Sequence, residues 1–453
     1  MKYDLAIIGG GPAGYVAAER AGEEGMKVIL FEKKELGGVC LNEGCIPTKT
    51  LLYSAKVYDT SLTSSKYGVY NENTSVDFAA IMKRKKKVVK KLVGGVGAKM
   101  KHAKVEVLND TAVLQGRDSE GVKIASGREL YTAANVLIST GSEAFVPPIP
   151  GLDLAADNIL TSREILELSE LPESLTIIGG GVIGMEFASF YNSMGVKVVV
   201  IEMLQKILGE MDTELSSELQ AIYEKRGVEI HLNAKVTEVK GDKVVYEKGG
   251  KTEELASDKI LVSVGRKPNI EGIGLESLGV ETLKGGVKVD EKMATNVPNV
   301  FAAGDVTGFS LLAHTAYREA EVVVNILIGK QDIMRYTAIP GVVYTNPEIS
   351  GVGHTEETAT EAGIEFKVAK LPMAYAGRFI AENEGGSGMC KVLIGSKYGE
   401  VLGVHMIGNP SSEMIYGAAM AIENEMTLDE MKEVVFPHPT VSEIFKETLF
   451  AIK

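Results

Sequence analysis

The sequence feature that most constrains the fold is a unit of strand, glycine turn, helix and strand that occurs twice in the 453 residues. The first unit runs from an apolar strand at residues 4–8 through a turn at 9–14 to a second strand that ends in Glu32. The second unit repeats this order 170 residues later, so that Gly179 corresponds to Gly9 and Glu202 to Glu32. Because strands joined by a crossover helix pair in parallel, both units predict an α/β fold with parallel sheets.

Both turns have the spacing GxGxxG, which binds dinucleotides when it follows a strand and opens a helix. The first glycine permits the tight turn, the second lets the backbone approach a pyrophosphate, and the third lets the helix pack closely on the strand. The acid that ends the second strand would accept hydrogen bonds from ribose hydroxyls. The predicted residues are Gly9, Gly11, Pro12, Ala13, Gly14 and Glu32 in the first unit, and Gly179, Gly181, Val182, Ile183, Gly184 and Glu202 in the second.

Two intact fingerprints predict two dinucleotides in one chain, most naturally a flavin and a nicotinamide cofactor. The alternative is a duplicated fold in which one of the two sites is empty. In the second unit Glu202 would repel the 2′-phosphate of NADP, and no arginine follows it at residues 203–206. NAD is therefore expected rather than NADP.

A pair of cysteines, Cys40 and Cys45, stands directly before a segment with helical character at residues 49–56. Cys45 is expected at or next to a helix N-terminus, where free N–H groups and the helix dipole favour a thiolate, and Pro47 fits the first helical position. The spacing does not fit a zinc site and no second pair exists, so no metal is predicted. The pair indicates thiol–disulfide chemistry, and the alternative is two unrelated buried thiols. Cys390 is interpreted as a small packed side chain.

Three other strand-like segments end in candidate cofactor-binding residues. Strand-like segments end in Gly141 and Gly265, and a third ends in Asp305, where a carboxylate can meet the ribityl hydroxyls of a flavin.

Near the C-terminus His438 stands between two prolines and is followed by Glu443. Because histidine titrates near neutral pH and a carboxylate can orient its ring, this pair is predicted to act as a general acid and base.

The chain is longer than one hydrophobic core supports, so several domains are expected, with a proline-rich connector at 146–151. No apolar run is long enough for a membrane span, no leader precedes the first strand and only 3 Cys are present, which predicts a cytoplasmic enzyme. The net charge of −13 argues against nucleic-acid binding. A basic run at residues 83–91 indicates either docking to an acidic partner or a solvated helix face.

Together, the cysteine segment 37–47, the two glycine units, Ala303-Gly304-Asp305 and the segment 438–443 resemble the pyridine nucleotide–disulfide oxidoreductases. The resemblance extends over essentially the whole chain. Within the family, the chain looks most like the branch that oxidises dihydrolipoyl groups with NAD, because Leu41-Asn42 and Glu202 are typical of that branch. It implies two Rossmann-like dinucleotide-binding domains, for FAD and NAD, and a C-terminal α+β dimerisation domain. The expected domains are 1–145 for FAD, completed by 266–336, then 146–265 for NAD and 337–453 for dimerisation.

The resemblance also implies roles for individual residues. Cys40 would exchange with the dithiol substrate, and Cys45 would lie against the flavin. His438, held by Glu443, would reach the active site of the other subunit, which implies a homodimer. Further contacts to FAD are implied from Lys49, Ala112, Gly141, Asp305 and Ala313. On the NAD side, contacts are implied from Glu186, Val236 and Gly265, and Glu186 would also pair with Lys49.

The substrate would arrive on a lipoylated protein of a 2-oxo acid dehydrogenase or glycine cleavage system. One departure from the family pattern is Phe436-Pro437, where many relatives have His-Ala before the catalytic His-Pro. Two alternatives stay open: a reductase for glutathione or another disulfide, and a chain that serves mainly as a binding subunit of a multienzyme core.

Overall fold

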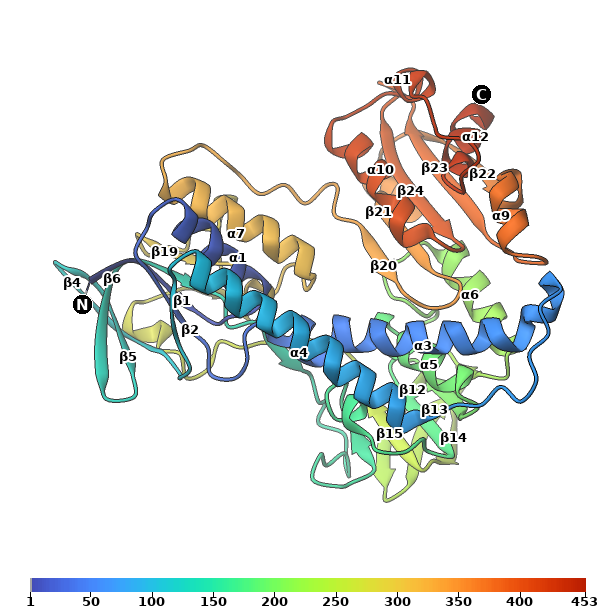
Figure 1. The fold of residues 1–453 in the computed structure, drawn as a ribbon, viewed down its shortest axis with the longest axis horizontal. Helices are drawn as coiled ribbons and strands as arrows, with labels where there is room; N and C mark the ends of the chain where they lie inside the picture. Colours follow the sequence, from blue (N-terminus) through green and yellow to red (C-terminus); the bar gives the residue numbers. More distant parts are fainter. Residues whose placement is uncertain (1) are drawn as a thin grey trace. The chain divides into compact units, whose positions relative to one another are not determined.

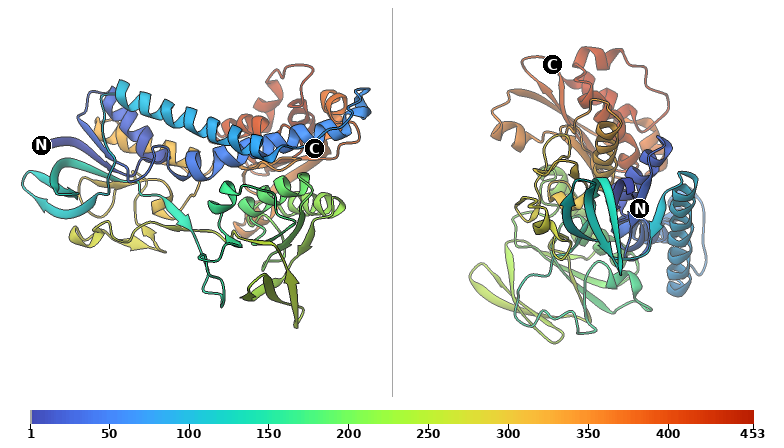
Figure 2. Two further views of the ribbon diagram at one scale, coloured as in Figure 1. Left: turned by 60° about the horizontal axis from the view of Figure 1, so that its bottom comes forward. Right: turned by 90° about the vertical axis from the view of Figure 1, so that its left-hand side faces the viewer.

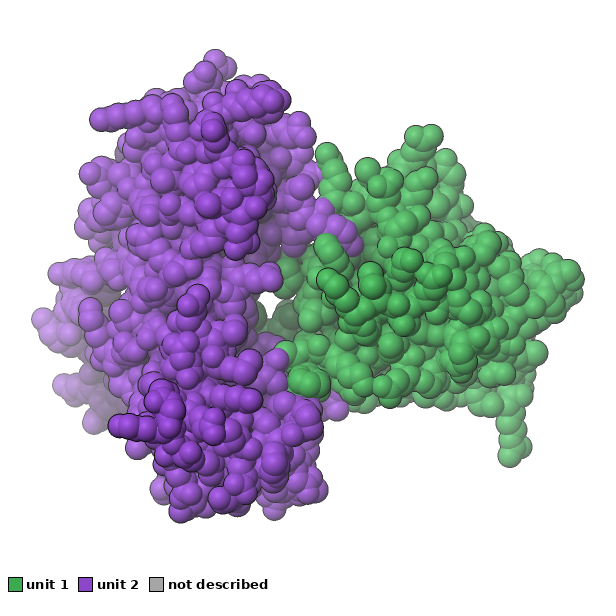
Figure 3. Space-filling view, turned by 180° about the vertical axis from the view of Figure 1, so that it is seen from behind, with its two compact units in different colours: residues 1–50, 80–145, 265–335 green, residues 51–79, 146–264, 336–453 purple. Residues whose placement is uncertain are grey.

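The computed structural model describes residues 2–453, which form two compact units (Figure 3). Unit 1 comprises residues 1–50, 80–145 and 265–335, and unit 2 comprises 51–79, 146–264 and 336–453. The three expected domain boundaries, after residues 145, 265 and 336, stay a prediction, because these units are coarser than the expected domains. Within residues 2–453, none of the helices has the length and apolarity needed to span a membrane.

Unit 1 is built on a seven-stranded sheet with the order β3-β2-β1-β6-β5-β4, in which β19 pairs with β6 (Figure 1). The strands β3, β2, β1, β6 and β19 run parallel, whereas β5 and β4 are antiparallel additions. The central strands are apolar runs because both of their faces are buried. Their bounds are β1 (Lys2–Ile8), β2 (Val28–Phe31), β3 (Glu106–Leu108), β4 (Val113–Asp118), β5 (Gly121–Ser126), β6 (Glu129–Ile138) and β19 (Val300–Ala302).

The helices of unit 1 include α1 (Pro12–Glu23) and α7 (Ala313–Leu327), which lie side by side (Figure 1). The long helix α4 (Phe78–His102) runs next to α1 (Figure 2). The side chains of Lys99 on α4 and Glu19 on α1 form an ion pair of 3.1 Å. The cysteines lie on two successive helices, α2 (Gly38–Glu43) and α3 (Cys45–Thr63). Smaller elements are β7 (Ser142–Ala144), β16 (Arg266–Pro268), β17 (Thr282–Leu283), β18 (Gly286–Val287) and the 3₁₀ helix η4 (Asp305–Thr307).

The first part of unit 2 is a parallel sheet with the order β11-β10-β9-β15-β8, followed by an antiparallel meander of β12, β13 and β14. The helix α5 (Val182–Ser193) connects β9 to β10, and α6 (Thr213–Lys225) connects β10 to β11. The strands are β8 (Ile159–Leu160), β9 (Ser174–Ile178), β10 (Lys197–Ile201), β11 (Glu229–His231), β12 (Ala234–Lys240), β13 (Lys243–Lys248), β14 (Lys251–Ala256) and β15 (Lys259–Val262).

The C-terminal part of unit 2 is an antiparallel sheet with the order β20-β21-β24-β23-β22, covered by helices. Its buried core includes Val392, Val404, Ala418 and Ile444. The elements are β20 (Gly341–Val343), β21 (Ile349–Gly353), α8 (Glu356–Glu361), β22 (Phe366–Pro372), α9 (Gly377–Glu382), β23 (Met389–Gly395), β24 (Val401–Ile407), α10 (Ser411–Glu423), α11 (Leu428–Glu433) and α12 (Glu443–Ala451). The predicted α/β class and the C-terminal α+β domain are confirmed.

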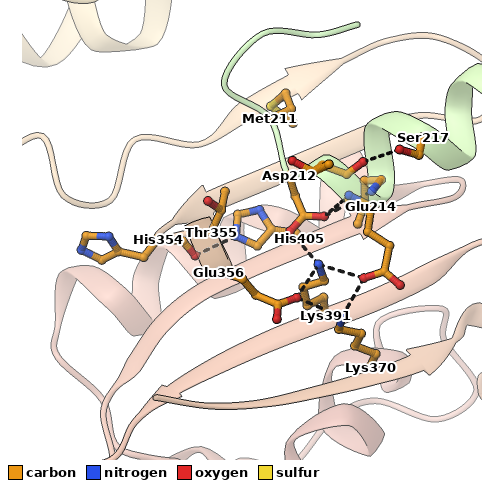
Figure 4. Close-up of polar contacts among 12 residues, drawn as sticks. Met211, Asp212, Glu214, Ser217, His354, Thr355, Glu356, Lys370, Lys391 and His405 are labelled. Carbon is orange, nitrogen blue, oxygen red and sulfur yellow. Dashed lines mark hydrogen bonds and ion pairs between the residues drawn. The ribbon is translucent and has the colours of Figure 1, made fainter. Parts of the chain in front are cut away.

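A buried ion pair links the two parts of unit 2 (Figure 4). The Nζ atom of Lys391, on β23, lies 2.7 Å from Oδ2 of Asp212, and both side chains are almost completely buried. Asp212 caps α6 by accepting hydrogen bonds from the backbone N–H groups of Glu214 and Leu215. The side chains of Glu214 and Glu356 complete the shell around the lysine. The loop after the second glycine unit is therefore anchored to the C-terminal sheet.

Candidate dinucleotide and dithiol sites

The first glycine turn has the geometry that its sequence predicts. Gly9 has a φ of +105°, a conformation that side chains other than glycine rarely adopt. A Cβ on Gly14 would overlap the carbonyl oxygen of Gly9, so only glycine lets α1 approach the turn this closely. The hydroxyl of Ser139, at the end of β6, donates to that same carbonyl at 2.9 Å. The turn is thus fixed from both sides.

Glu32 closes the first unit with its carboxylate turned back to the turn. It is buried, and its two oxygens accept from the backbone N–H groups of Gly10 at 2.7 Å and Lys34 at 2.8 Å. At the start of α1, Gly11 is the N-cap without a side-chain cap, Pro12 is the first helical residue, and no acid lies in the first turn. Uncapped N–H groups and an oriented carboxylate fit the pyrophosphate and ribose of FAD.

The second glycine turn repeats this geometry in unit 2. Gly179 has a φ of +103°, and the hydroxyl of Ser263 donates to its carbonyl at 2.9 Å. The carboxylate of Glu202 accepts from the N–H groups of Gly180 at 2.7 Å and Leu204 at 2.8 Å. Gly181 is the uncapped N-cap of α5, whose first turn contains Val182, Ile183 and Gly184 and no acid. These residues fit a second dinucleotide, and the carboxylate of Glu202 fits NAD.

Asp305 lies in unit 1, where β19 ends beside the first glycine turn. Its Oδ2 accepts from the Ser142 hydroxyl at 2.5 Å and lies 3.8 Å from Nε of Arg266. Burial raises the pKa of Asp305, although the Ser142 hydrogen bond and the Arg266 charge act in the opposite direction. A Cβ on Gly304 would lie 3.4 Å from Cβ of Ala13, which places this carboxylate near the start of α1. Sequence reasoning missed Ser142 and Arg266, because neither belongs to a local motif.

The other residues predicted to contact FAD also lie in unit 1. Ala112 is buried just before β4, Gly141 follows β6 with a φ of +71°, and Ala313 begins α7. Lys49 lies on α3, one turn after Cys45. Their contacts with a flavin stay a prediction.

The structure brings the two cysteine side chains into contact with each other. Cys40 lies on α2, Cys45 is the first residue of α3, and Gly44 forms the bend between the helices. The hydrogen bond with Cys45, followed by burial, raises the pKa of Cys40, and the positive charge of Lys49 acts in the opposite direction. Because Cys40 and Cys45 contact each other, the alternative interpretation as two unrelated buried thiols is excluded. Pro47 is the third residue of α3 and not the first as expected; its missing N–H is harmless there, because the first turn has no partners for these groups.

Two tyrosines near Cys40 were not predicted. Tyr15, on α1, and Tyr317, on α7, join their hydroxyls at 2.7 Å, and both side chains are half-buried. The pKa of Tyr15 is raised by burial, by the Tyr317 hydroxyl and, in smaller part, by the charge of a Cys40 thiolate. Their 302-residue separation hides the pair from sequence reasoning.

The remaining residues predicted on the NAD side lie in different places. Glu186, on α5 in unit 2, is buried and accepts from the N–H of Tyr344 at 3.1 Å. Its expected pairing with Lys49, a residue of unit 1, stays a prediction. Val236 is buried on β12, and its contact with NAD stays a prediction. Gly265 follows β15 with a φ of +125°.

His438 and Glu443 are close together in unit 2. Nδ1 of His438 lies 2.8 Å from Oε1 of Glu443, whose Oε2 accepts from the N–H of Thr440 at 3.0 Å. The hydrogen bond with His438, together with that from Thr440, lowers the pKa of Glu443. The imidazole is 80% exposed, so its second nitrogen faces outward. The carboxylate therefore fixes the ring orientation, as the sequence predicts.

Comparison with known proteins defines the class. Residues 3–320 match the family of pyridine nucleotide-disulphide oxidoreductases, and residues 339–449 match the dimerisation domain of that family. The chain therefore belongs to the pyridine nucleotide-disulphide oxidoreductases. The predicted family, the enzyme class and the cofactors FAD and NAD are confirmed by this membership.

Within this family, the chain is similar along its whole length to dihydrolipoyl dehydrogenases. It is 38% identical to that of Geobacillus stearothermophilus, with 99% of this chain and 95% of the relative covered, and 39% identical to that of Rhizobium etli, with 99% and 97% covered. Among solved structures, the HOCl-induced flavoprotein disulfide reductase RclA of Escherichia coli, in a Cu(II) complex, has a TM-score of 0.88 at 29% identity, and both chains are completely covered. The match to the dimerisation domain supports the expected homodimer.

Proposed function

We propose that this chain oxidises protein-bound dihydrolipoyl groups to lipoyl groups and reduces NAD. The observation that carries the proposal is the similarity to dihydrolipoyl dehydrogenases over 99% of the chain, with the cysteine pair in place beside the first glycine turn. The alternative, a glutathione reductase-like enzyme, gains no comparable support. We propose further that the enzyme works as a homodimer in the cytoplasm, with the lipoylated protein of a 2-oxo acid dehydrogenase or glycine cleavage system as its partner.

The residues assigned to the two cofactors follow from the two turns. The uncapped N-terminus of α1, Glu32 and Asp305 would hold FAD, and the uncapped N-terminus of α5 and Glu202 would hold NAD. FAD, when bound, supplies the two-electron redox chemistry that connects the enzyme dithiol to NAD.

The protein's own chemistry is a thiol–disulfide exchange. A substrate thiolate attacks the sulfur of Cys40 in the oxidised Cys40–Cys45 disulfide, which forms a mixed disulfide and releases Cys45 as a thiolate. The second substrate thiol, as its thiolate, then attacks the substrate sulfur of the mixed disulfide and releases Cys40. The products are a lipoyl disulfide and an enzyme dithiol, so two electrons pass from the substrate to the cysteine pair.

Only a thiolate attacks effectively, so the exchange requires a base. His438 takes the substrate proton on Nε2, because Nδ1 is committed to Glu443. The exposure of the ring and the dimerisation domain support a role for His438 in the site of the partner subunit.

The decisive experiment measures the reduction of NAD by dihydrolipoamide with purified, flavin-loaded protein, with NADP and reduced glutathione in parallel. Rapid reduction of NAD with the lipoyl dithiol alone is expected. A yellow protein that is inactive with dihydrolipoamide, or active with glutathione, would contradict the proposed substrate.

The role of His438 is tested by His438→Gln. Dithiol oxidation should fall about 10²–10⁴-fold, as expected for a lost general base, while electron transfer from NADH to a dye continues. Equal losses in both assays would contradict this role.

A further inference from the structure

The helix α4 has an unusual concentration of charge. Its 25 residues include nine lysines and arginines and not a single acid, although the whole chain has a net charge of −13. Solvated helix faces commonly alternate charges of opposite sign, because such pairs stabilise a helix. A helix with one sign of charge is therefore not explained by solubility alone.

Four of these lysines form one exposed face. Lys83, Lys87, Lys90 and Lys91 lie within one third of the helix circumference at 3.6 residues per turn, and all four are exposed. Within residues 2–453, none of the four takes part in an ion pair. Elsewhere on α4, Lys99 pairs with Glu19 and Lys85 is buried. We call Lys83, Lys87, Lys90 and Lys91 the lysine face.

This arrangement costs free energy in the isolated protein. Like charges at positions i and i+4, as in Lys83 with Lys87 and Lys87 with Lys91, repel each other and destabilise a helix. An anionic surface brought against the lysine face would remove this repulsion and replace it with attraction.

The lysine face lies near the redox pair. Arg84, between two of the four lysines, donates from Nη1 to the carbonyl of Thr50 on α3 at 3.0 Å. Thr50 is five residues after Cys45, which is about 7.5 Å along the helix. A protein domain bound to the lysine face would therefore bring its dithiol arm within reach of the cysteine pair.

We propose that the lysine face docks a carboxylate-rich surface of the protein domain that carries the dithiol. The inference rests on the proposed function, which requires a protein-bound substrate. Such a surface raises the local concentration of the carrier and its rate of association. A nucleic acid is the less suitable anion, because the strong negative charge of the rest of the chain would repel it.

The test compares two substrates and two variants of the flavin-loaded dimer. One variant is Lys83→Gln/Lys87→Gln/Lys90→Gln/Lys91→Gln; its matched control is Lys66→Gln/Lys225→Gln/Lys251→Gln/Lys292→Gln, four exposed lysines outside α4. The substrates are free dihydrolipoamide and an isolated acidic lipoyl domain of a 2-oxo acid dehydrogenase, reduced to its dihydrolipoyl form. A version of that domain with its surface carboxylates changed to amides is measured alongside.

We expect kcat/KM for the carrier domain to fall about tenfold or more in the lysine-face variant at low salt, a loss of electrostatic steering. The control variant should keep the kcat/KM of the unaltered enzyme, and the lysine-face variant should match the unaltered enzyme when the carrier domain is neutralised or the salt is high. All three proteins should oxidise free dihydrolipoamide at the same rate. Equal rates of the two variants with the acidic carrier, or lysine-dependent binding of a DNA duplex in its place, would overturn the docking proposal. An unaltered enzyme that does not oxidise free dihydrolipoamide would instead contradict the proposed function.

Discussion

The two glycine turns are nearly the same structure with different surroundings. Each has a left-handed glycine, a serine hydroxyl on its carbonyl at 2.9 Å and a carboxylate that accepts from a turn N–H at 2.7 Å. The loop that follows each carboxylate also folds back to the middle glycine of its turn in the same way. The N–H of Gly37 donates to the carbonyl of Gly10, and the N–H of Leu208 donates to the carbonyl of Gly180. The duplication therefore includes contacts that the GxGxxG pattern does not contain.

The two turns differ in the atoms that cover the second glycine of the GxGxxG pattern, which is Gly11 in the first turn and Gly181 in the second. In the first turn the start of α2 leans on Gly11, and a Cβ on Gly38 would lie 2.6 Å from its Cα. In the second turn a Cβ on Gly181 would meet nothing within 4 Å. A turn covered by the redox helix suits a cofactor that stays bound, and an open turn suits a coenzyme that enters and leaves in each cycle.

The largest expected effect separates the two turns directly. Gly14→Ala forces the backbone of the first turn to move, because the added Cβ would overlap the Gly9 carbonyl. We expect the purified protein to lose most of its flavin absorbance, and with it dithiol oxidation. Gly184→Ala creates the same overlap in the second turn and should leave the flavin bound while the affinity for NAD falls. Flavin loss in both variants would show that the two turns are not independent.

A smaller effect is expected from the anchor of the loop that follows the second turn. Lys391→Met leaves the buried carboxylate of Asp212 without its counter-ion, which should lower the free energy of unfolding by about 3–5 kcal/mol. Lys370→Met is the matched control: this lysine contacts Glu214 and Glu356 but is 38% exposed, so a loss of about 1 kcal/mol or less is expected. Similar losses in urea unfolding of both variants would contradict the anchoring role.

The same pair gives a pH dependence. Burial lowers the pKa of Lys391, but its hydrogen bonds to Asp212 and Glu356 outweigh burial, so the pKa is raised. A raised lysine pKa contributes stability below the unfolded value near 10.4, and this contribution is lost as the pH rises through the folded value. The loss of unfolding free energy caused by Lys391→Met should therefore be constant between about pH 6 and 9 and should become smaller only at more alkaline pH.

The smallest effect concerns the choice of nicotinamide. Glu202→Gln removes the charge that would repel a 2′-phosphate and weakens the contact to the ribose. Loss of a charged hydrogen bond of about 1.5–3 kcal/mol corresponds to a fall in NAD affinity of about 10–150-fold, and the preference for NAD over NADP should decrease. Glu32→Gln should affect flavin content and leave this preference unchanged. An unaltered NAD/NADP ratio in Glu202→Gln would contradict the assignment.

The sequence predicts those parts of the site that depend on local chemistry. The glycine turns, the helix N-terminus at Cys45 and the His438–Glu443 pair follow from residues within a few positions of one another. Long-range partners were not predictable: Ser139 reaches Gly9 across 130 residues, and Lys391 reaches Asp212 across 179. Such contacts arise when strands are placed next to one another, and neither residue has a local pattern that reveals its partner.

The contact between Gly38 and Gly11 couples the loading of the first site to the reactivity of the cysteines. Because α2 rests on the turn, any shift of the turn in the apoprotein moves the helix on which Cys40 lies. We therefore expect alkylation of Cys40 to proceed at different rates in a chain without flavin and in a flavin-loaded one, so that this thiol would report on occupancy before any turnover is measured.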